Sequence, residues 1–418
     1  MKKSFWGVCL GLLVMVALFS TVSAANVQVR ISGWGGTDQP IIEDMLRLFV
    51  NPALQKEGIT VLYEPIADDF QRYIANALSA KTAPDLFYMD VMWAQSLIEA
   101  GLVEPLDSYI AKSNMLKKED FIPSLIEAYT YQGKVYGIPK DFNTLALFYN
   151  KDIFDMAGVA YPDENDTWDT LAKKLEQVSK LDGIYGLALQ PEFARMGQFA
   201  FAAGFELFDK DGKTNLSHPG FKAAVKWYTD LAKSRAGVMP ANIGQSWGGG
   251  AFATEQVAAC IEGAWVIGSL RDQAPNLNYG TTFLPKDPST GKRGNLIFCV
   301  AWGMNKDSKN KQAAFKVLEQ LTSPEVQQWI LERGLALPSR VALADNPYFK
   351  QNNREAQANY IVFKGASEGI VKPFSFGKYG GEWADPINEN LRAIMSGEIT
   401  LEEGLREAQY RIDQLMQR

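Results

Sequence analysis

The stretch over residues 135–151 constrains the fold of this chain more than any other. Two apolar, strand-like pieces flank a polar cluster, Lys140-Asp141-Phe142-Asn143-Thr144. Pro139 excludes a helix through Ile138, because proline has no N–H and its ring clashes with the preceding residue. The sequence therefore predicts an extended segment that carries polar side chains between two strands.

The first residues are typical of an exported protein. Lys2 and Lys3 precede an apolar run over residues 8–19, and Val22-Ser23-Ala24 offers the small residues of a cleavage site. This pattern predicts a secretory signal peptide over residues 1–24. A membrane anchor is the alternative, but the run is shorter than the roughly 20 residues that a span needs. We therefore expect a periplasmic or otherwise extracytoplasmic protein.

Charge and length narrow the class of protein further. The formal net charge is -6, and removing the two lysines of the predicted peptide makes it -8. A nucleic-acid-binding protein needs a basic face, and no cluster of Lys and Arg is present, so nucleic acid is not an expected partner. The 394 residues that follow the peptide exceed the roughly 250–300 at which one core stops growing, so two lobes are expected.

Cys260 and Cys299 are the only cysteines after the predicted peptide, and both lie in apolar, strand-like segments. A disulfide between them is compatible with an oxidising compartment, but buried thiols also behave as small hydrophobic groups. The sequence leaves both alternatives open. No metal motif is present, and no metal or cofactor is expected.

The beginning of the chain alternates strands and helices. A strand over residues 27–32 runs into Gly33-Trp34-Gly35-Gly36, and a buried strand over 84–90 ends at Asp90, before a helix from about Trp93. In open parallel sheets, ligands bind beyond the carboxyl ends of the strands. We therefore expect Trp34, Asp90 and Trp93 in a binding site.

Several further motifs follow in an order similar to that of one known family. They are Gly-Val-Ala-Tyr-Pro at 158–162, Thr-Trp-Asp at 167–169, Gly263-Ala264-Trp265-Val266 and Tyr379-Gly380-Gly381-Glu382-Trp383. Together with residues 135–151, they resemble the sugar-type extracellular solute-binding proteins that feed ABC importers. The resemblance covers nearly all of the chain after residue 24.

The resemblance implies an α/β fold of the periplasmic-binding-protein (clamshell) type, in which each lobe is a mixed sheet flanked by helices. The hinge is expected at three crossings, near residues 140–145, 300–305 and 360–372. The implied N-terminal lobe holds residues 25–140 plus 303–361, and the C-terminal lobe holds 144–300 plus 365–418. A monomer is expected, with the membrane-embedded permease subunits of an ABC importer as partners.

The tryptophans favour a sugar as the ligand. Several of the nine that follow the predicted peptide lie close to glycines: Trp34 directly follows Gly33, Trp265 follows Gly263 by two residues, and Trp247 directly precedes Gly248. Glycine lets the backbone approach a ligand closely, and an indole face stacks on the C–H face of a pyranose. Packing in the core is the alternative for each of them.

Sugar hydroxyl groups also need fixed acceptors and donors. Asp90, Asp141 and Asn143 each follow an apolar strand or the proline-fixed segment. A hydrogen bond to a charged group contributes about 1.5–3 kcal/mol, so two such bonds with stacked rings suffice for the roughly -8 kcal/mol of micromolar binding. A helix cap on the surface is the alternative for each aspartate. The full set of expected ligand-binding residues is Trp34, Asp90, Trp93, Asp141, Asn143, Trp247, Trp265, Trp302, Tyr379 and Trp383.

An enzyme is the alternative from another class. A secreted glycoside hydrolase would also be acidic and rich in tryptophan, and it would need two catalytic carboxylates. The sequence lacks the eight strand–helix repeats of a barrel hydrolase, and its single histidine, His218, leaves no ordinary catalytic triad. We therefore expect a receptor without catalytic activity. It would capture a di- or oligosaccharide between its lobes and deliver it to an ABC importer by hinge closure.

Overall fold

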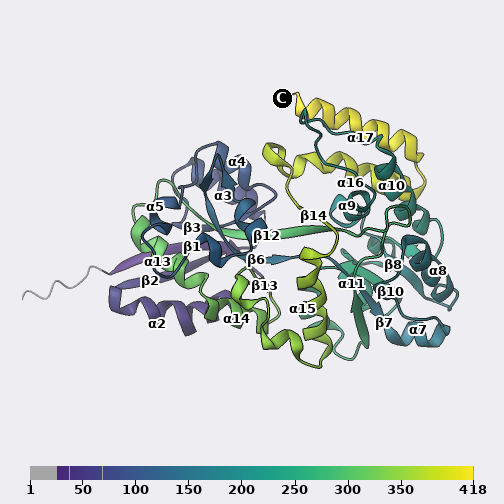
Figure 1. Ribbon diagram of the computed structural model, residues 1–418, viewed down its shortest axis with the longest axis horizontal. Helices are drawn as coiled ribbons and strands as arrows, with labels where there is room; N and C mark the ends of the chain where they lie inside the picture. Colours follow the sequence, from purple (N-terminus) through teal and green to yellow (C-terminus); the bar gives the residue numbers. More distant parts are fainter. Residues whose placement is uncertain (1–25, 37, 68, 418) are drawn as a thin grey trace, which may run out of the picture.

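The protein folds into two lobes that lie side by side in the computed structural model (Figure 1). The structure describes residues 26–36, 38–67 and 69–417, so the predicted signal peptide lies outside the described residues. Each lobe contains one large mixed sheet with helices around it. The predicted two-lobed α/β fold is confirmed.

The sheet of the first lobe has the strand order β13-β6-β12-β3-β1-β2. Strand β1 pairs in parallel with β2 and β3, whereas β12 is antiparallel to β3 and β6. The carboxyl ends of β1 and β3 therefore lie at the same edge of the sheet. The strands are β1 (Val27–Trp34), β2 (Ile59–Ile66), β3 (Leu86–Asp90), β6 (Gly137–Asn143), β12 (Gly294–Met304) and β13 (Leu337–Pro338).

The sheet of the second lobe has the strand order β11-β7-β10-β8-β9. Here β8 is parallel to β9 and β10, so the carboxyl ends of these three strands also share one edge. Strand β7 is antiparallel to β10 and β11. The strands are β7 (Ala146–Asn150), β8 (Tyr185–Ala188), β9 (Gly237–Val238), β10 (Val257–Glu262) and β11 (Tyr279–Thr282). A separate hairpin consists of β4 (Thr130–Tyr131) and β5 (Lys134–Val135).

Helices surround both sheets (Figure 1). One group of helices is formed by the chain before β6 and by the chain directly after β12. It consists of α1 (Asp38–Met45), α2 (Asn51–Leu54), α3 (Phe70–Ser79), α4 (Ala94–Glu99), α5 (Asp107–Ile110), α6 (Pro123–Glu127), α13 (Lys311–Leu321) and α14 (Pro324–Glu332). Those between β7 and β11 are α7 (Lys151–Ala157), α8 (Trp168–Val178), α9 (Phe193–Ala202), α10 (Pro219–Ala232), α11 (Gly248–Ala253) and α12 (Trp265–Gln273). The chain ends with α15 (Arg354–Lys364), strand β14 (Ile370–Pro373), the 3-10 segment η8 (Gly377–Trp383), α16 (Asp385–Ser396) and α17 (Leu401–Met416). None of the helices in the described residues is long and apolar enough to cross a membrane.

Strand β12 runs from one lobe into the other. Its residues 294–297 pair with β14, and its residues 298–304 pair with β3 and β6 of the first sheet. The change of partners thus falls a few residues before the expected crossing at 300–305. A second crossing joins β6 to β7, where the Asn295 side chain binds the backbone N–H and C=O of Leu145 at 3.0 and 2.9 Å.

The packing of helix α15 differs from the implied division of the chain, which assigns residues 303–361 to the N-terminal lobe. This helix packs against β11 of the second sheet. The Arg354 guanidinium donates to the carbonyls of Pro275 and Leu277 and lies 5.0 Å from the centre of the Tyr279 ring. The third connection between the lobes therefore includes α15 itself.

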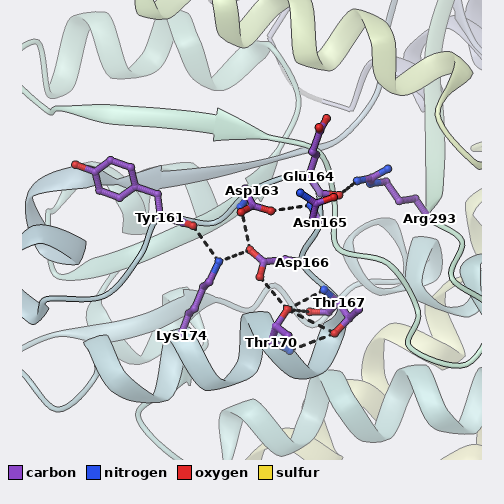
Figure 2. Close-up of polar contacts among 9 residues, drawn as sticks. All are labelled: Tyr161, Asp163, Glu164, Asn165, Asp166, Thr167, Thr170, Lys174 and Arg293. Carbon is purple, nitrogen blue, oxygen red and sulfur yellow. Dashed lines mark hydrogen bonds and ion pairs between the residues drawn. The ribbon is translucent and has the colours of Figure 1, made fainter.

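A polar network fixes the start of helix α8 (Figure 2). Thr167 and Thr170 form a capping box, in which each side chain binds the other residue's backbone N–H. The Asp166 carboxylate accepts from the Thr170 hydroxyl at 2.8 Å and from the Lys174 ammonium at 2.7 Å. The Arg293 guanidinium, directly before β12, binds the Glu164 carbonyl. This network ties α8 to the strand that crosses between the lobes.

The two cysteines are buried free thiols, one on β10 and the other on β12. The sequence leaves open whether Cys260 and Cys299 form a disulfide, and in the structure they do not. The Cys299 thiol donates to the Asp141 carbonyl at 3.2 Å. His218, the single histidine, caps helix α10 by accepting from the Gly220 N–H at 3.1 Å.

Candidate ligand-binding cleft

Two adjoining cavities lie between the lobes. The inner cavity, about 240 Å³, and the outer cavity, about 570 Å³, are both lined by Asp38, Trp265 and Leu335. Because they share these walls, the cavities form one cleft. The inner cavity is also lined by Trp34, Asp90, Lys140, Asp141, Asn143 and Phe298. The outer one is also lined by Trp247, Arg271, Asp272 and Arg333.

The first lobe contributes residues from the carboxyl ends of its parallel strands. Trp34 ends β1 and packs edge-on against Tyr88, with ring centres 5.3 Å apart. Asp90 ends β3, and its carboxylate accepts from the Met92 N–H at 2.8 Å. Asp38 begins α1, directly after the glycine-rich loop that follows Trp34. Ligands bind beyond the carboxyl ends of parallel strands, and this rule accounts for the positions of Trp34 and Asp90.

A β-bulge in β6 directs a buried ion pair toward the inner cavity. Val300 of β12 pairs with Asp141 and the next residue, Ala301, pairs with Pro139, so Lys140 is the extra residue on β6. A bulge of this kind bends the strand and changes the direction of its side chains. Lys140 and Asp141 consequently both line the inner cavity, and their ammonium and carboxylate groups bind each other. The Lys140 ammonium also lies 4.5 Å from the centre of the Tyr88 ring.

Three carboxylates, those of Asp38, Asp90 and Asp141, line the inner cavity. Burial raises the pKa of Asp38 to about 6, partly offset by the Lys140 charge and increased by the Asp141 charge. Burial also raises the pKa of Asp90 to about 6, although the Met92 N–H opposes this shift. The pKa of Asp141 is raised by burial as well, against the charge of Lys140. The cavity therefore changes its protonation in the weakly acidic range.

The second lobe contributes Trp265, at the start of α12. Its indole N–H donates to the Glu262 carboxylate at 2.8 Å, and the Arg195 guanidinium binds the same oxygen at 2.7 Å. Arg195 also lies 5.5 Å from the centre of the Trp265 ring. Phe298 packs edge-on against this ring at 5.4 Å and 89°. The indole is thus partly buried, with several of its sides occupied by protein.

Gly263 and Gly249, near Trp265 and Trp247, do not have the expected role of letting a ligand approach the backbone. A Cβ atom at Gly263 would lie 2.5 Å from the Trp265 ring, and one at Gly249 would lie 2.3 Å from the Trp247 ring. Each indole folds back over the neighbouring glycine. The missing side chains therefore make room for the tryptophans themselves, rather than for a ligand against the backbone.

A model of the bacterial extracellular solute-binding proteins matches residues 49–356. The chain belongs to this family. It is 28% identical over 349 residues to a Brucella abortus (strain 2308) protein described only as a binding protein, a match that covers 81% of this chain and 82% of the relative. It is also 28% identical over 349 residues to the maltotriose-binding protein of Pyrococcus abyssi (strain GE5 / Orsay), covering 78% and 72% of the two chains.

A solved structure has the same fold as this solute-binding protein. The ABC substrate-binding protein from Listeria monocytogenes in complex with cycloalternan matches with a TM-score of 0.83 and 22% identity, over 93% of this chain and 98% of that chain. A likeness at this level of identity concerns the fold alone. The similarity of the two folds agrees with the two-lobed architecture of the present solute-binding protein.

The structure places Trp302, Trp383 and Trp93 in the cores of the lobes, which corrects the expectation that they contact a ligand. Trp302 is 1% exposed and packs edge-on against Tyr88 at 4.6 Å. Trp383 is 0% exposed and stacks on Phe376 at 4.9 Å and 13°. Trp93 is also buried. Their apolar neighbours, which come from distant parts of the sequence, leave almost no surface for a ligand.

Two other expected residues have a different placement. The Asn143 side chain lines the inner cavity, but its carbonyl oxygen accepts from the Ala264 N–H at 2.9 Å and so joins the two lobes. Tyr379 lines a separate cavity of about 450 Å³ together with Met92 and Ser96. It is therefore not brought together with Trp265.

The sequence did not indicate Asp38 and Lys140, which line the inner cavity, nor Arg271, Asp272 and Arg333, which line the outer one. It also did not indicate Glu262 and Arg195, which line neither cavity but contact Trp265. Glu262 ends a parallel strand directly before Gly263, so the signal that indicates Asp90 also applies to it. Lys140 has no such signal, because its direction depends on the bulge. No group of three or more His, Cys, Asp or Glu suited to a metal ion occurs in the part of the chain that the structure describes.

Proposed function

We propose that this solute-binding protein captures a di- or oligosaccharide in the cleft between its lobes. The observation that carries the proposal is the composition of the inner cavity. There, the indoles of Trp34 and Trp265 accompany the carboxylates of Asp38, Asp90 and Asp141. Aromatic faces stack on pyranose rings, and ionised carboxylates accept hydrogen bonds from hydroxyl groups. The maltotriose-binding relative supports the same class of ligand.

Closure of the lobes is the proposed signal to the membrane. A sugar that contacts Asp90 on one lobe and Trp265 on the other binds the closed form better, so it shifts the hinge equilibrium toward that form. The closed receptor would dock on the permease subunits of an ABC importer. Export through a cleaved peptide over residues 1–24 is part of the proposal, and it accords with the extracellular family.

A hydrolytic enzyme is the alternative, and Asp38 and Asp90 would be its carboxylates. A raised pKa is characteristic of the acid in such a pair. Membership of a solute-binding family favours the receptor. We therefore propose that the protein binds sugar without cleaving it.

The proposal is tested with the residues that follow position 24. Melting temperatures are measured with maltotriose, lactose, galactooligosaccharides and mannobiose, and any sugar that raises the melting temperature is titrated by calorimetry. Small-angle scattering should show a smaller radius of gyration with that sugar bound. Reducing ends are measured in the same samples. An unchanged melting temperature and radius across the panel would contradict the receptor, and released reducing sugar would favour the hydrolase.

Trp265→Ala should weaken sugar binding at least about tenfold, because it removes the aromatic face shared by the two cavities. Trp227→Phe is the matched control, since this tryptophan lies in the same lobe and donates its N–H to the Trp168 carbonyl, away from both cavities. The control should bind as the wild type does.

A further inference from the structure

Glu262 and Arg195 form a buried ion pair next to Trp265, which lines both cavities of the cleft. Glu262 is 0% exposed, yet one carboxylate oxygen receives both the Trp265 indole N–H at 2.8 Å and the Arg195 guanidinium at 2.7 Å. Arg195 contacts the indole a second time, 5.5 Å from the ring centre. Glu262 and Arg195 therefore bind each other, and both also contact the Trp265 indole.

Stability alone does not account for this buried ion pair. A buried pair gains little over apolar residues of the same shape unless all of its polar atoms are satisfied. Here, the second oxygen of Glu262 and the Nε of Arg195 are buried and have no hydrogen-bond partner among the described residues. The one further side chain that the carboxylate does bind is Trp265. The pair is thus arranged around the indole.

The backbone next to the pair is adapted to the same arrangement. A Cβ atom at Gly248 would lie 2.8 Å from the free oxygen of Glu262, and one at Gly263 would lie 2.5 Å from the Trp265 ring. Glycine at both positions leaves room for the carboxylate and for the indole. Trp265 lines both the inner and the outer cavity, so its indole is part of the wall that the two cavities share.

We infer that Glu262 and Arg195 are positioning residues that hold the Trp265 indole in place before a sugar arrives. An aromatic side chain that is ordered in advance loses less conformational freedom on binding, which increases the affinity. The role of Trp265 toward a sugar rests on the proposed function. The inference about the orientation of its indole in the free protein is independent of that function.

The test uses sugar-free protein and near-UV circular dichroism, which reports aromatic rings in a fixed environment. Each variant is compared with the same variant carrying Trp265→Phe, so that the difference is the Trp265 band. Glu262→Gln keeps an oxygen that accepts from the indole and should keep most of the band. The double variant Glu262→Leu with Arg195→Met removes the pair without leaving a lone charge, and its band should fall to below about half.

Asp272→Asn is the matched control, because this exposed carboxylate lines the outer cavity and has no bond to the indole. It should keep the full band. Far-UV dichroism checks that each variant is folded. If the double variant does not fold, Arg195→Lys replaces it: this change keeps the charge but removes the planar group beside the ring, and part of the band should disappear.

A full Trp265 band in the folded double variant, or in Arg195→Lys where that variant replaces it, would overturn the inference. With any sugar that binds the wild type, the double variant should bind about tenfold more weakly, whereas Glu262→Gln should bind much as the wild type does. All dichroism spectra are recorded without sugar. A failure of the proposed receptor function would therefore leave the result on positioning unaffected.

Discussion

Lys140 and Asp141 are neighbours on strand β6, yet their side chains bind each other inside the inner cavity. Consecutive side chains of a regular strand point to opposite faces. The bulge opposite Val300 and Ala301 removes this alternation and brings both charges to the same side. The pair has 6% and 9% of its side-chain surfaces exposed, so each charge depends on the other.

Replacing Lys140 by Met should destabilise the protein by about 3–5 kcal/mol, because it leaves the Asp141 carboxylate buried without its partner. The measurement is the free energy of unfolding in urea at pH 7. Lys226→Met is the matched control, since the Lys226–Asp230 pair lies on the surface of α10, with the lysine side chain 69% exposed. The control should change the free energy by less than about 1 kcal/mol. Equal losses for the two variants would mean that the buried pair has no special role.

The stability should depend on pH through Asp38 and Asp90. The pKa of each is raised from 3.8 to about 6 in the folded protein. Between these values the folded protein binds more protons than the unfolded chain. The free energy of unfolding should therefore decrease as the pH rises from about 4 to about 6, by at most about 3 kcal/mol for each group.

The double variant Asp38→Asn with Asp90→Asn should lose this part of the pH dependence. Urea unfolding at pH 4, 5, 6 and 7 measures it, and Asp272→Asn serves as a control from the exposed rim of the cleft. The same slope in the double variant and in the wild type would show that other groups cause the dependence.

Gly249→Ala and Gly268→Ala should have opposite effects. A Cβ atom at Gly249 would lie 2.3 Å from the Trp247 ring, so alanine should displace the indole and cost about 1–3 kcal/mol. At Gly268, inside α12, the nearest atom would be 3.9 Å away, and alanine should stabilise the helix by up to about 1 kcal/mol. Urea unfolding compares the two variants. A destabilised Gly268→Ala with an unchanged Gly249→Ala would contradict the described packing of Trp247.

Cys260 and Cys299 should both be titrated as free thiols, but only after unfolding. Burial raises the pKa of each well above its ordinary value, so little reactive thiolate forms in the folded protein. Ellman's reagent should detect almost no thiol at pH 8 and two thiols per chain in 6 M urea, with protein that begins after residue 24. Mass spectrometry without reduction provides the control. A mass lower by two hydrogen atoms would show a disulfide instead.

Much of the cleft follows from local signals in the sequence. The predicted strands over residues 27–32 and 84–90 are parallel strands, although β1 continues two residues further, to Trp34. Trp34 and Asp90 line the cleft at the carboxyl ends of these strands, as the strand-end rule predicts. The same rule, applied to the strand that ends at Glu262, would have indicated the second lobe's carboxylate. Lys140 and Arg195 have no comparable signal, since a bulge and a contact between distant segments place them.

The sequence by itself determined the extended course of β6 around Pro139, the strand that ends at Asp90 and the two-lobed family, because these depend on nearby residues and on the order of motifs. Only the tertiary structure decided which tryptophans face the cleft. Trp265 lies between two cavities whereas Trp302 is enclosed, and this difference comes from the packing of segments far apart in the chain. Burial is a property of those neighbours, and the local sequence does not contain them.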